Sequence, residues 1–254
     1  MLPAPLARAL AWIALASATA ACASGPANRI SEGQEGAPGV RRVLLCPPNL
    51  VLALRSEIQS GWQPVDHEVE AYLQSQGREV GRLGLIEGRN HWKQAIAEAK
   101  AAGSLTSASG IFVGRLAQDH EFDAVVMPSL ILHQTRVESG GASWNGVSRR
   151  MRVVNAPAKG VGRDDSTFVK GIAYGGISGP AWVTSLHVLV YTRGGQLIFE
   201  GRGGIDFVQE ADLTDASAKY RWEPRPNSSL FRDRTLLYES VVQAFEPYLV
   251  PPDE

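Results

Sequence analysis

The stretch WVTSLHVLVY, residues 182–191, decides the fold. Its large apolar residues alternate with smaller or polar ones, as expected for a β-strand with one buried face. Arg193-Gly194-Gly195 follows almost at once, and glycine-rich segments of this kind form tight turns. Residues 197–201 then resume an apolar pattern. Together these segments predict a β-hairpin, and therefore an antiparallel pair of strands, in the C-terminal half of the chain.

Upstream of this hairpin, strand and helix patterns alternate. Short apolar runs predict strands at residues 43–46 and 80–85, and a stronger run predicts a strand at residues 124–132. Pro128 interrupts the last of these, which predicts a bulge or an edge position, because proline has no N–H to donate. Helices are predicted at residues 50–58, 64–76, 92–101 and 111–116, and the second of them begins at Pro64 and stops at Gly77.

Downstream of the hairpin, the sequence predicts one further helix over residues 229–246, ended by Pro247. This order of elements predicts an α/β (α+β) fold, in which helices pack on a mixed, mostly antiparallel sheet. The predicted domain is single and covers residues 41–250, with a long glycine-rich loop inserted at residues 139–180. The apolar face of the last helix is marked by Phe231, Leu237, Val241 and Phe245.

The N-terminus resembles an export signal. The apolar run after Arg8 is shorter than the ~20 residues that cross a bilayer as a helix, so residues 1–21 are predicted to be a signal peptide. Small residues lead into Cys22, which resembles a bacterial lipobox, where the cysteine is lipidated. Plain secretion is the alternative, because Ala18-Thr19-Ala20 and Ala21-Cys22-Ala23 also match small-residue cleavage sites.

The segment after the lipobox has the composition of a tether. Residues 22–40 are rich in Gly, Ser and Pro, and a flexible chain of this length reaches about 20–25 Å. A membrane-anchored domain needs such a spacer, which favours lipidation over plain secretion. The resemblance to Gram-negative lipoproteins implies a location as well, because Ala23 after the cysteine implies an outer-membrane lipoprotein that faces the periplasm.

The loop at residues 139–180 is the second informative feature, because it mixes glycines with basic and aromatic residues. Arginine and large aromatic side chains dominate binding energy at protein interfaces, so one interpretation is a recognition loop. The other is a hairpin extension over residues 147–154 with mobile flanks. Phosphates of anionic lipid or lipopolysaccharide are further candidate targets. The candidate partner-binding residues are Trp144, Arg149, Arg150, Arg152, Phe168 and Lys170.

Charge and cysteine content narrow the function classes. The 254-residue chain has a formal net charge of −1, so no overall basic field attracts nucleic acid. The two cysteines, Cys22 and Cys46, do not have the spacing of a zinc site. Cys46 ends an apolar run and is expected to be an inert buried thiol, although a disulfide with Cys22 is possible if Cys22 is neither lipidated nor removed.

No catalytic or metal-binding motif stands out. The five histidines never recur at the spacing that places two ligands on one helix face. His187 alternates with core residues in the predicted hairpin strand, where a structural histidine is expected rather than a base. Gly175-Gly176-Ile177-Ser178-Gly179 fails the spacing of a nucleophile elbow. The chain is therefore expected to be no enzyme and to use no cofactor or metal.

Three short motifs resemble one recurring pattern. They are Phe122-Asp123-Ala124-Val125-Val126, Trp144-Asn145-Gly146-Val147 and residues 191–201. The pattern is similar to that of bacterial envelope lipoproteins whose domain resembles the TolB amino-terminal domain, among them the curli-export lipoprotein and the lipoprotein activators of peptidoglycan synthases. The resemblance covers residues 41–249 and implies a noncatalytic domain that docks onto other envelope proteins. It carries over no functional residues, and the long loop departs from the compact members.

Three functions follow as hypotheses. The first is a lipid-anchored adaptor or assembly factor for an envelope protein complex. The second is a periplasmic ligand- or glycan-binding module that uses Trp144, Trp182 or Trp222 as stacking surfaces. The third is a hydrolase whose site is assembled from residues far apart in the sequence, which requires a pocket with perturbed titratable groups.

Overall fold

The computed structural model describes residues 29–30, 39–51, 62–154, 177–212 and 220–246. Its centre is a six-stranded sheet, formed by β1 (Arg29–Ile30), β2 (Arg42–Leu45), β3 (Glu79–Arg82), β4 (Ala124–Val137), β8 (Gly179–Thr192) and β9 (Leu197–Phe207). The strand order is β1-β9-β8-β4-β2-β3. β2 is parallel to β3 and β4, whereas the remaining neighbours are antiparallel. The predicted mixed α/β class is confirmed.

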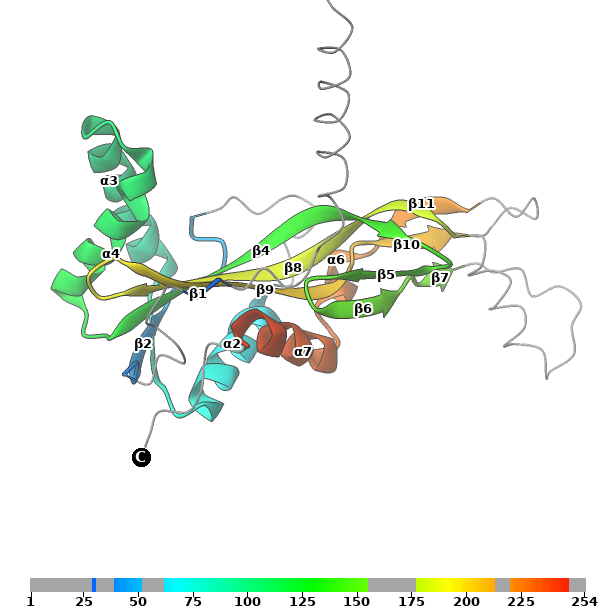
Figure 1. Cartoon of the computed structure of the whole chain (residues 1–254), viewed down its shortest axis with the longest axis horizontal. Coiled ribbons are helices and arrows are strands. Elements are labelled where there is room, and N and C mark those ends of the chain that lie inside the picture. The colour runs from blue at the N-terminus through cyan, green and yellow to red at the C-terminus, as the bar shows by residue number, and fades with distance from the viewer. Residues whose placement is uncertain (1–28, 31–38, 52–61, 155–176, 213–219, 247–254) are drawn as a thin grey trace, which may run out of the picture.

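The predicted hairpin is β8 and β9, and it forms the long axis of the molecule. β8 pairs with β4 without interruption, from Gly179 opposite Val137 to Thr192 opposite Ala124. β4 and β8 each have 14 residues, so they are longer than predicted. The molecule is elongated, with α3 (Leu85–Ala101) and α4 (Ala108–Asp119) at one end and small sheets at the other (Figure 1).

One face of the sheet, here named the first face, is covered by α2 (Gln63–Ser75) and α7 (Arg234–Phe245) (Figure 1). Buried aliphatic and aromatic residues from the sheet and both helices form one continuous core there. α7 lies very close to β9, because Gly201 and Gly203 have no side chain. A Cβ atom on either glycine would overlap the backbone of α7, at Ala244 and Ser240 respectively.

The predicted C-terminal helix is two helices rather than one. α6 (Asn227–Leu230) ends before Phe231, and α7 begins at Arg234. The carboxylate of Asp233 caps α7 by accepting hydrogen bonds from the N–H groups of Thr235 at 3.0 Å and Leu236 at 3.3 Å. The break lets the Phe231 ring, 2 % exposed, turn into the first-face core.

The opposite face, here named the second face, is covered only at its two ends by described elements. At one end α3 (Leu85–Ala101), η2 (Leu105–Ser107) and α4 (Ala108–Asp119) pack over a second core. At the other end β5 (Gly141–Trp144) and β6 (Val147–Arg150) pack over a third core. A small sheet of β7 (Val153–Val154), β10 (Gln209–Asp212) and β11 (Arg221–Pro224) extends this second end (Figure 1).

The first α-helical hairpin begins earlier than predicted. The strand predicted at residues 80–85 ends at Arg82, and the helix predicted from residue 92 already begins at Leu85. α3 buries only Gly88, Ala95 and Ala99, which are all small, so its first turns carry no strong apolar periodicity. The short helix predicted at residues 111–116 is α4, which is longer at both ends.

Pro128 lies inside β4 without a bulge. The β4–β8 register runs through it without a shift, with Pro128 opposite Val188. Its carbonyl oxygen accepts a hydrogen bond from the N–H of Asn49 at 3.0 Å, on the side away from β8. Because the N–H that proline lacks would point to that same side, pairing with β8 is unaffected. Of the two predicted alternatives, the bulge is wrong and the edge position fits, because β2 has already ended beside Pro128.

Several expectations concern single residues or segments. Cys46 is fully buried, and burial raises the pKa of its thiol, which agrees with an inert core cysteine. Within the described ranges, no helix has the length and apolar content needed to span a bilayer. The predicted signal peptide, Cys22, most of the tether, most of the helix predicted at residues 50–58, Phe168 and Lys170 lie outside the described residues.

Candidate interaction surface

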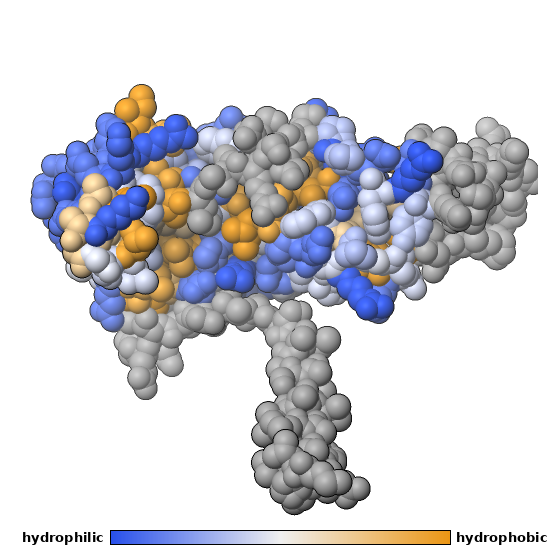
Figure 2. Space-filling view, turned by 90° about the horizontal axis from the view of Figure 1, so that it is seen from above, coloured by the Kyte–Doolittle hydropathy of each residue, from blue (hydrophilic) through white to orange (hydrophobic). Residues whose placement is uncertain are grey.

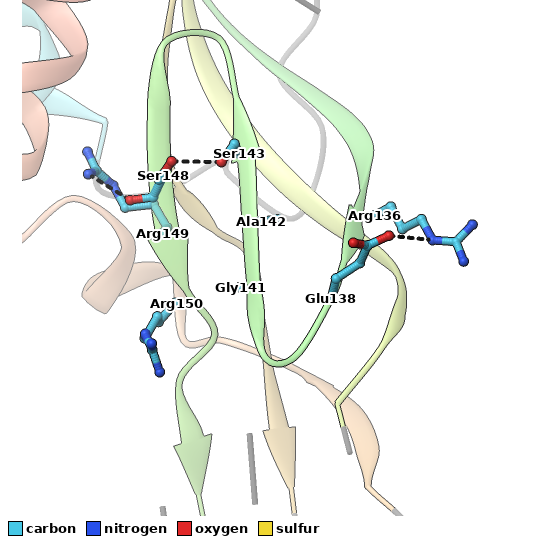
Figure 3. Close-up of a pocket in the computed structure, with 8 residues that line it drawn as sticks. All are labelled: Arg136, Glu138, Gly141, Ala142, Ser143, Ser148, Arg149 and Arg150. Carbon is cyan, nitrogen blue, oxygen red and sulfur yellow. Dashed lines mark hydrogen bonds and ion pairs between the residues drawn. The ribbon is translucent and has the colours of Figure 1, made fainter. Parts of the chain in front are cut away.

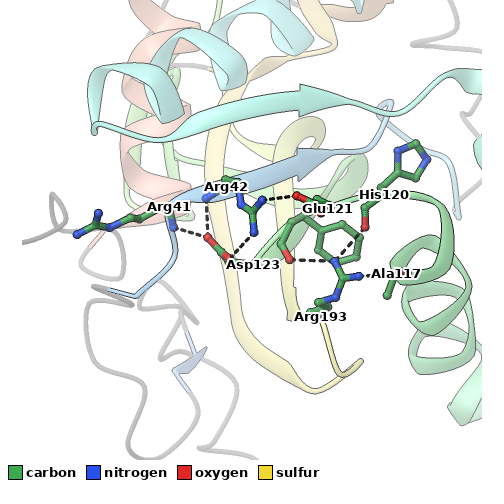
Figure 4. Close-up of polar contacts among 8 residues, drawn as sticks. Arg41, Arg42, Ala117, His120, Glu121, Asp123 and Arg193 are labelled. Carbon is green, nitrogen blue, oxygen red and sulfur yellow. Dashed lines mark hydrogen bonds and ion pairs between the residues drawn. The ribbon is translucent and has the colours of Figure 1, made fainter.

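One motif residue of the resemblance, Arg193, ties α4 to the sheet (Figure 4). The guanidinium of Arg193 donates to the carbonyl oxygens of Ala117 at 2.6 Å and His120 at 2.9 Å, at the C-terminal end of α4. Terminal helix carbonyls have no partner within the helix, so this contact caps α4. The same guanidinium lies over the ring of Phe122, 5.2 Å from its centroid.

Asp123 organises the start of β2 in a similar way. Its carboxylate accepts hydrogen bonds from the backbone N–H groups of Arg41 at 3.0 Å and Arg42 at 2.7 Å. The guanidinium of Arg42 lies 2.7 Å from the carboxylate of Glu121 and 3.8 Å from that of Asp123 (Figure 4). The motif residues Phe122, Asp123 and Arg193 thus join neighbouring elements and have structural roles.

The remaining motif of the resemblance, residues 144–147, contains the turn between β5 and β6. Asn145 and Gly146 have φ values of 43° and 80°, the backbone of a two-residue type I′ hairpin turn. The Asn145 side-chain amide donates to the Ser185 hydroxyl at 2.9 Å. Gly146 lies against Gln243 of α7, where a Cβ atom would overlap the glutamine side chain. The turn is therefore held between β8 and α7.

Two of the predicted partner-binding residues, the buried Trp144 and the half-buried Arg149, make contacts within the protein. Trp144 is 4 % exposed and packs edge-on against Phe207, with ring centroids 5.1 Å apart. Arg149 donates to the carbonyl oxygen of Ile205 at 3.1 Å and pairs with Glu239 of α7 at 2.8 Å. The prediction that Trp144 and Arg149 contact a partner does not fit this placement. Both residues instead fasten the β5–β6 hairpin to the body.

The outward face of the β5–β6 hairpin is small and polar. Gly141 pairs with Arg150 and Ser143 with Ser148, and these four residues share the face opposite to Trp144. The hydroxyl oxygens of Ser143 and Ser148 are 2.7 Å apart and form a hydrogen bond across the two strands (Figure 3). With only small side chains at its centre, this face is hollow between the larger residues that flank it.

A pocket of about 490 Å³ lies over this hollow face (Figure 3). Arg136 and Glu138 line it from the end of β4, and Arg150 lines it from β6. Arg136 and Glu138 form an ion pair of 3.3 Å, but their side chains are 84 % and 75 % exposed. Such an exposed pair is weak, so both charged groups can exchange their partner for another. The pocket suits a polar or charged partner rather than an apolar ligand.

Of the remaining predicted interface residues, Arg150 and Arg152 are at the surface, and Phe168 and Lys170 lie outside the described residues. Arg150 and Arg152 are exposed, and Arg152 lies 3.6 Å from the carboxylate of Glu210. Trp182 and Trp222, which were candidate stacking surfaces, are both partly buried against hydrophobic cores. Trp222 also packs edge-on against Tyr220, with centroids 5.0 Å apart. Both tryptophan side chains therefore contribute to packing within the protein rather than forming open stacking surfaces.

Polar residues occupy the middle of the second face, between its two covered ends. His187 Nε2 lies 3.0 Å from the carboxylate of Glu200, and Ser129 is directly opposite His187 on β4. Burial lowers the pKa of His187, an effect that the hydrogen bond with Glu200 opposes and the charge of Arg202 reinforces. Ser129 is 3 % exposed, and no hydrogen bond joins its hydroxyl to the imidazole in the described part of the chain. These residues therefore lack the nucleophile–base contact of a hydrolase.

The α3 end carries a second open pocket, of about 760 Å³. Leu85 and Ile86, which line it, are 38 % and 78 % exposed. In the view from above, hydrophobic residues reach the surface at this end of the molecule (Figure 2). Glu87 and His120 pair at 2.8 Å nearby and join α3 to the end of α4. Among the residues that the structure describes, no three His, Cys, Asp or Glu side chains converge on a metal position.

Comparisons of the chain with protein-family models, with curated proteins and with solved structures give no match.

Proposed function

We propose that this chain is a lipid-anchored envelope protein that acts as a noncatalytic adaptor or assembly factor for an envelope protein complex. The observation that carries this proposal is the outward face of the β5–β6 hairpin. It combines an open polar pocket with exposed charged side chains, at the end of a long β-ribbon and away from the helical end (Figures 1 and 3). Arg136 and Arg150 are the residues that we expect to contact the partner.

The rigidity of this surface supports a docking role. Trp144 packs on Phe207, and Arg149 binds both β9 and α7, so the hairpin is fixed to the body rather than hinged. A fixed recognition surface binds without losing much conformational entropy. The outward residues can then vary in charge and size without disturbing the packing on the inward side.

The sequence supplies the membrane part of the proposal. Small residues lead into Cys22, and a Gly/Ser/Pro-rich spacer follows it. A diacylated or triacylated cysteine would hold the protein stably, because stable anchoring takes more than one acyl chain. The tether would let the body reach partners about 20–25 Å from the membrane surface. Ala23 favours the outer membrane, with the body in the periplasm.

In-cell crosslinking followed by affinity capture tests this function. Wild type is compared with Cys22→Ala and with the double variant Arg136→Glu/Arg150→Glu. We expect a stoichiometric envelope protein with wild type, reduced capture with Cys22→Ala, and loss of capture with the double variant. Arg89→Glu is the matched control, because Arg89 is an exposed arginine on α3, at the opposite end of the molecule.

Two results would contradict the proposal. If wild type captures no envelope protein, the adaptor function fails. If both the double variant and Arg89→Glu capture as well as wild type, the hairpin surface has no part in docking. A thermal shift of wild type with cell-wall fragments, in the absence of any captured protein, would favour the ligand-binding alternative.

A further inference from the structure

The backbone of β4 has a side that faces away from β8. On that side the carbonyl oxygen of Val126 accepts from the N–H of Cys46 at 2.9 Å, and that of Pro128 accepts from Asn49 at 3.0 Å. Leu130 binds the Asn49 side chain through both its N–H, at 2.7 Å, and its carbonyl oxygen, at 3.0 Å. These contacts all involve even-numbered residues, because backbone groups alternate sides along a strand.

Among the described residues, no strand pairs with the next stretch of β4 on this side. β2 pairs only with residues 124–126 of β4. By the same alternation, the N–H and C=O groups of Leu132, Gln134 and Arg136 point away from β8. In the described ranges no strand pairs with them, although Gln134 and Arg136 are exposed to solvent. Long open strand edges are sites at which another chain can add.

The open edge has defined ends. Asn49 closes it at Leu130, where its side-chain amide takes the place of a paired peptide group. At the other end Glu138 and Gly141 exchange backbone hydrogen bonds of 2.8 Å and 3.0 Å around the tight Ser139–Gly140 turn. Five residues, at ~3.3 Å each, give a slot about 16 Å long. A slot of this length fits one short strand.

β4 and β5 separate beyond the Glu138–Gly141 bridge, and the pocket described above lies where they separate. After the Glu138–Gly141 bridge β5 turns to pair with β6, so Arg136 and Ser143 line the pocket from opposite sides without pairing. A third pocket, of about 410 Å³, is lined by Gln134, Thr135 and Arg136 of β4 and by Gly179 and Pro180 of β8, so it lies over the β4–β8 pair rather than at the open edge. Among the described residues of this edge, Gln134 and Arg136 are exposed to solvent, whereas Leu132 is half-buried against the first-face core.

We propose that the β4 edge from Leu132 to Arg136 binds an extended, acidic segment of a partner protein as an additional strand. This inference rests on the proposed adaptor function and names the form in which the partner is recognised. Main-chain hydrogen bonds supply the affinity in this mode, and side chains in flanking pockets supply the specificity. Arg136 and Arg150 would face the partner's carboxylates. Glu138 is the acidic residue among those that line the pocket.

The charge of the pocket favours a partner over a second copy of this chain. Pairing of two β4 edges would bring two arginine-rich pockets together, because each copy contributes Arg136 and Arg150. Like charges in close contact destabilise such pairing. An acidic segment would instead place carboxylates beside these arginines, and Arg136 would exchange its exposed ion pair with Glu138 for the incoming carboxylate.

The native Pro128 shows how to test the edge. It occupies an even position of β4 and leaves the β8 pairing intact. Gln134→Pro is the same change at the open edge, since it removes an N–H that points away from β8 and adds a ring that obstructs an incoming strand. The matched control is Gln134→Thr, which keeps the N–H and favours a strand. Thermal unfolding and circular dichroism establish that both variants fold.

The probe is a phage-displayed library of random ten-residue peptides, selected on the full, processed protein in detergent. We expect selected peptides to be acidic and to bind Gln134→Pro at least about tenfold more weakly, because one hydrogen bond and the fit of the strand are lost. Gln134→Thr should bind within about twofold of wild type. In hydrogen exchange, peptide should slow the amides of Leu132, Gln134 and Arg136, whereas those of His133 and Thr135 are already protected by β8.

Several outcomes would overturn the proposal. Equal binding of the peptides to Gln134→Pro, or exchange protection elsewhere, would exclude the edge. Concentration-dependent dimers of wild type that Gln134→Pro abolishes would assign the edge to a second copy. In cells, partner capture that survives Gln134→Pro but is lost with Arg136→Glu/Arg150→Glu would leave the adaptor function standing and refute only the added strand. No capture by wild type would refute the function itself.

Discussion

The hydroxyl of Ser240 on α7 donates a hydrogen bond to the carbonyl oxygen of Gly203 on β9, at 3.0 Å, and both residues are buried. Helix and strand approach this closely because Gly203 lacks a side chain. A Cβ atom there meets the backbone of α7, which cannot move aside as a flexible side chain would. The first-face core therefore depends on glycine at this position as much as on its large apolar residues.

Gly203→Ala is accordingly expected to lower the free energy of unfolding by at least about 3 kcal/mol. Gly114→Ala is the matched control. Gly114 lies inside α4, and a methyl group added there would have no other atom within 4 Å, so alanine should be neutral or stabilise by up to about 1 kcal/mol through helix propensity. Urea unfolding of both variants checks this, and equal effects would contradict it.

Asn49 should be hard to replace, because it has a φ of 57° and its amide makes both hydrogen bonds to Leu130. Asn49→Ala loses the two bonds and places a side chain in the left-handed region, so we expect a loss of about 2–3 kcal/mol. Asn49→Gly loses only the bonds and should lose about 1–2 kcal/mol. If equilibrium unfolding shows that Asn49→Gly is less stable than Asn49→Ala, the assigned backbone strain is wrong.

The cap formed by Arg193 gives a third prediction. Arg193→Ala leaves the terminal carbonyls of α4 without their donor and removes the contact with Phe122, so a loss of about 1–3 kcal/mol is expected. Arg193→Lys should be intermediate, because an ammonium cannot reach two carbonyls as a planar fork does. Arg41→Ala should change stability by less than about 0.5 kcal/mol, because only the backbone N–H of Arg41 binds Asp123. Chemical unfolding of the three variants checks this order, and a loss with Arg41→Ala as large as that with Arg193→Ala would contradict it.

The pH dependence of stability should report the histidines of the second face. Burial lowers the pKa of His187 and of His133 below the usual 6.5, and Arg202 lowers both further. The unfolded chain then binds protons more readily than the folded one, so stability is full above about pH 6.5 and falls as the pH drops through that value. Between about pH 7.5 and 5.5, His133→Gln/His187→Gln should lose less stability than wild type in urea titrations. Equal losses would show that these two groups do not contribute.

Local sequence signals predicted the strands better than the loops. The alternation in residues 182–191 survives in β8, because a long strand with one buried face leaves a regular pattern. The insertion predicted at residues 139–180 begins with regular structure, as the hairpin interpretation expected, but the hairpin is formed by residues 141–150 rather than 147–154. Asn145-Gly146 is the dipeptide that type I′ hairpin turns favour, and the number of glycines around it obscures this signal.

The candidate site was predicted only in part, for a physical reason. Arg149 and Arg150 are adjacent and chemically identical, yet Arg149 is half-buried and pairs with Glu239 of α7, whereas Arg150 is exposed. Which of two neighbours in a strand points inward depends on register, and the sequence of a short polar strand does not specify it. The open edge of β4 is likewise a property of tertiary structure, since it exists because β2 is short.

The position of α7 along the chain has a consequence for biogenesis. Residues 234–245 complete a core whose other helix is encoded at residues 63–75, and Phe245 stacks on Tyr72 with ring centroids 5.3 Å apart. A chain that emerges N-terminus first therefore cannot complete this core until residues 234–245 have been delivered. If the chain is exported unfolded, as the proposed function requires, this long-range closure would delay folding until residues 234–245 have crossed the membrane.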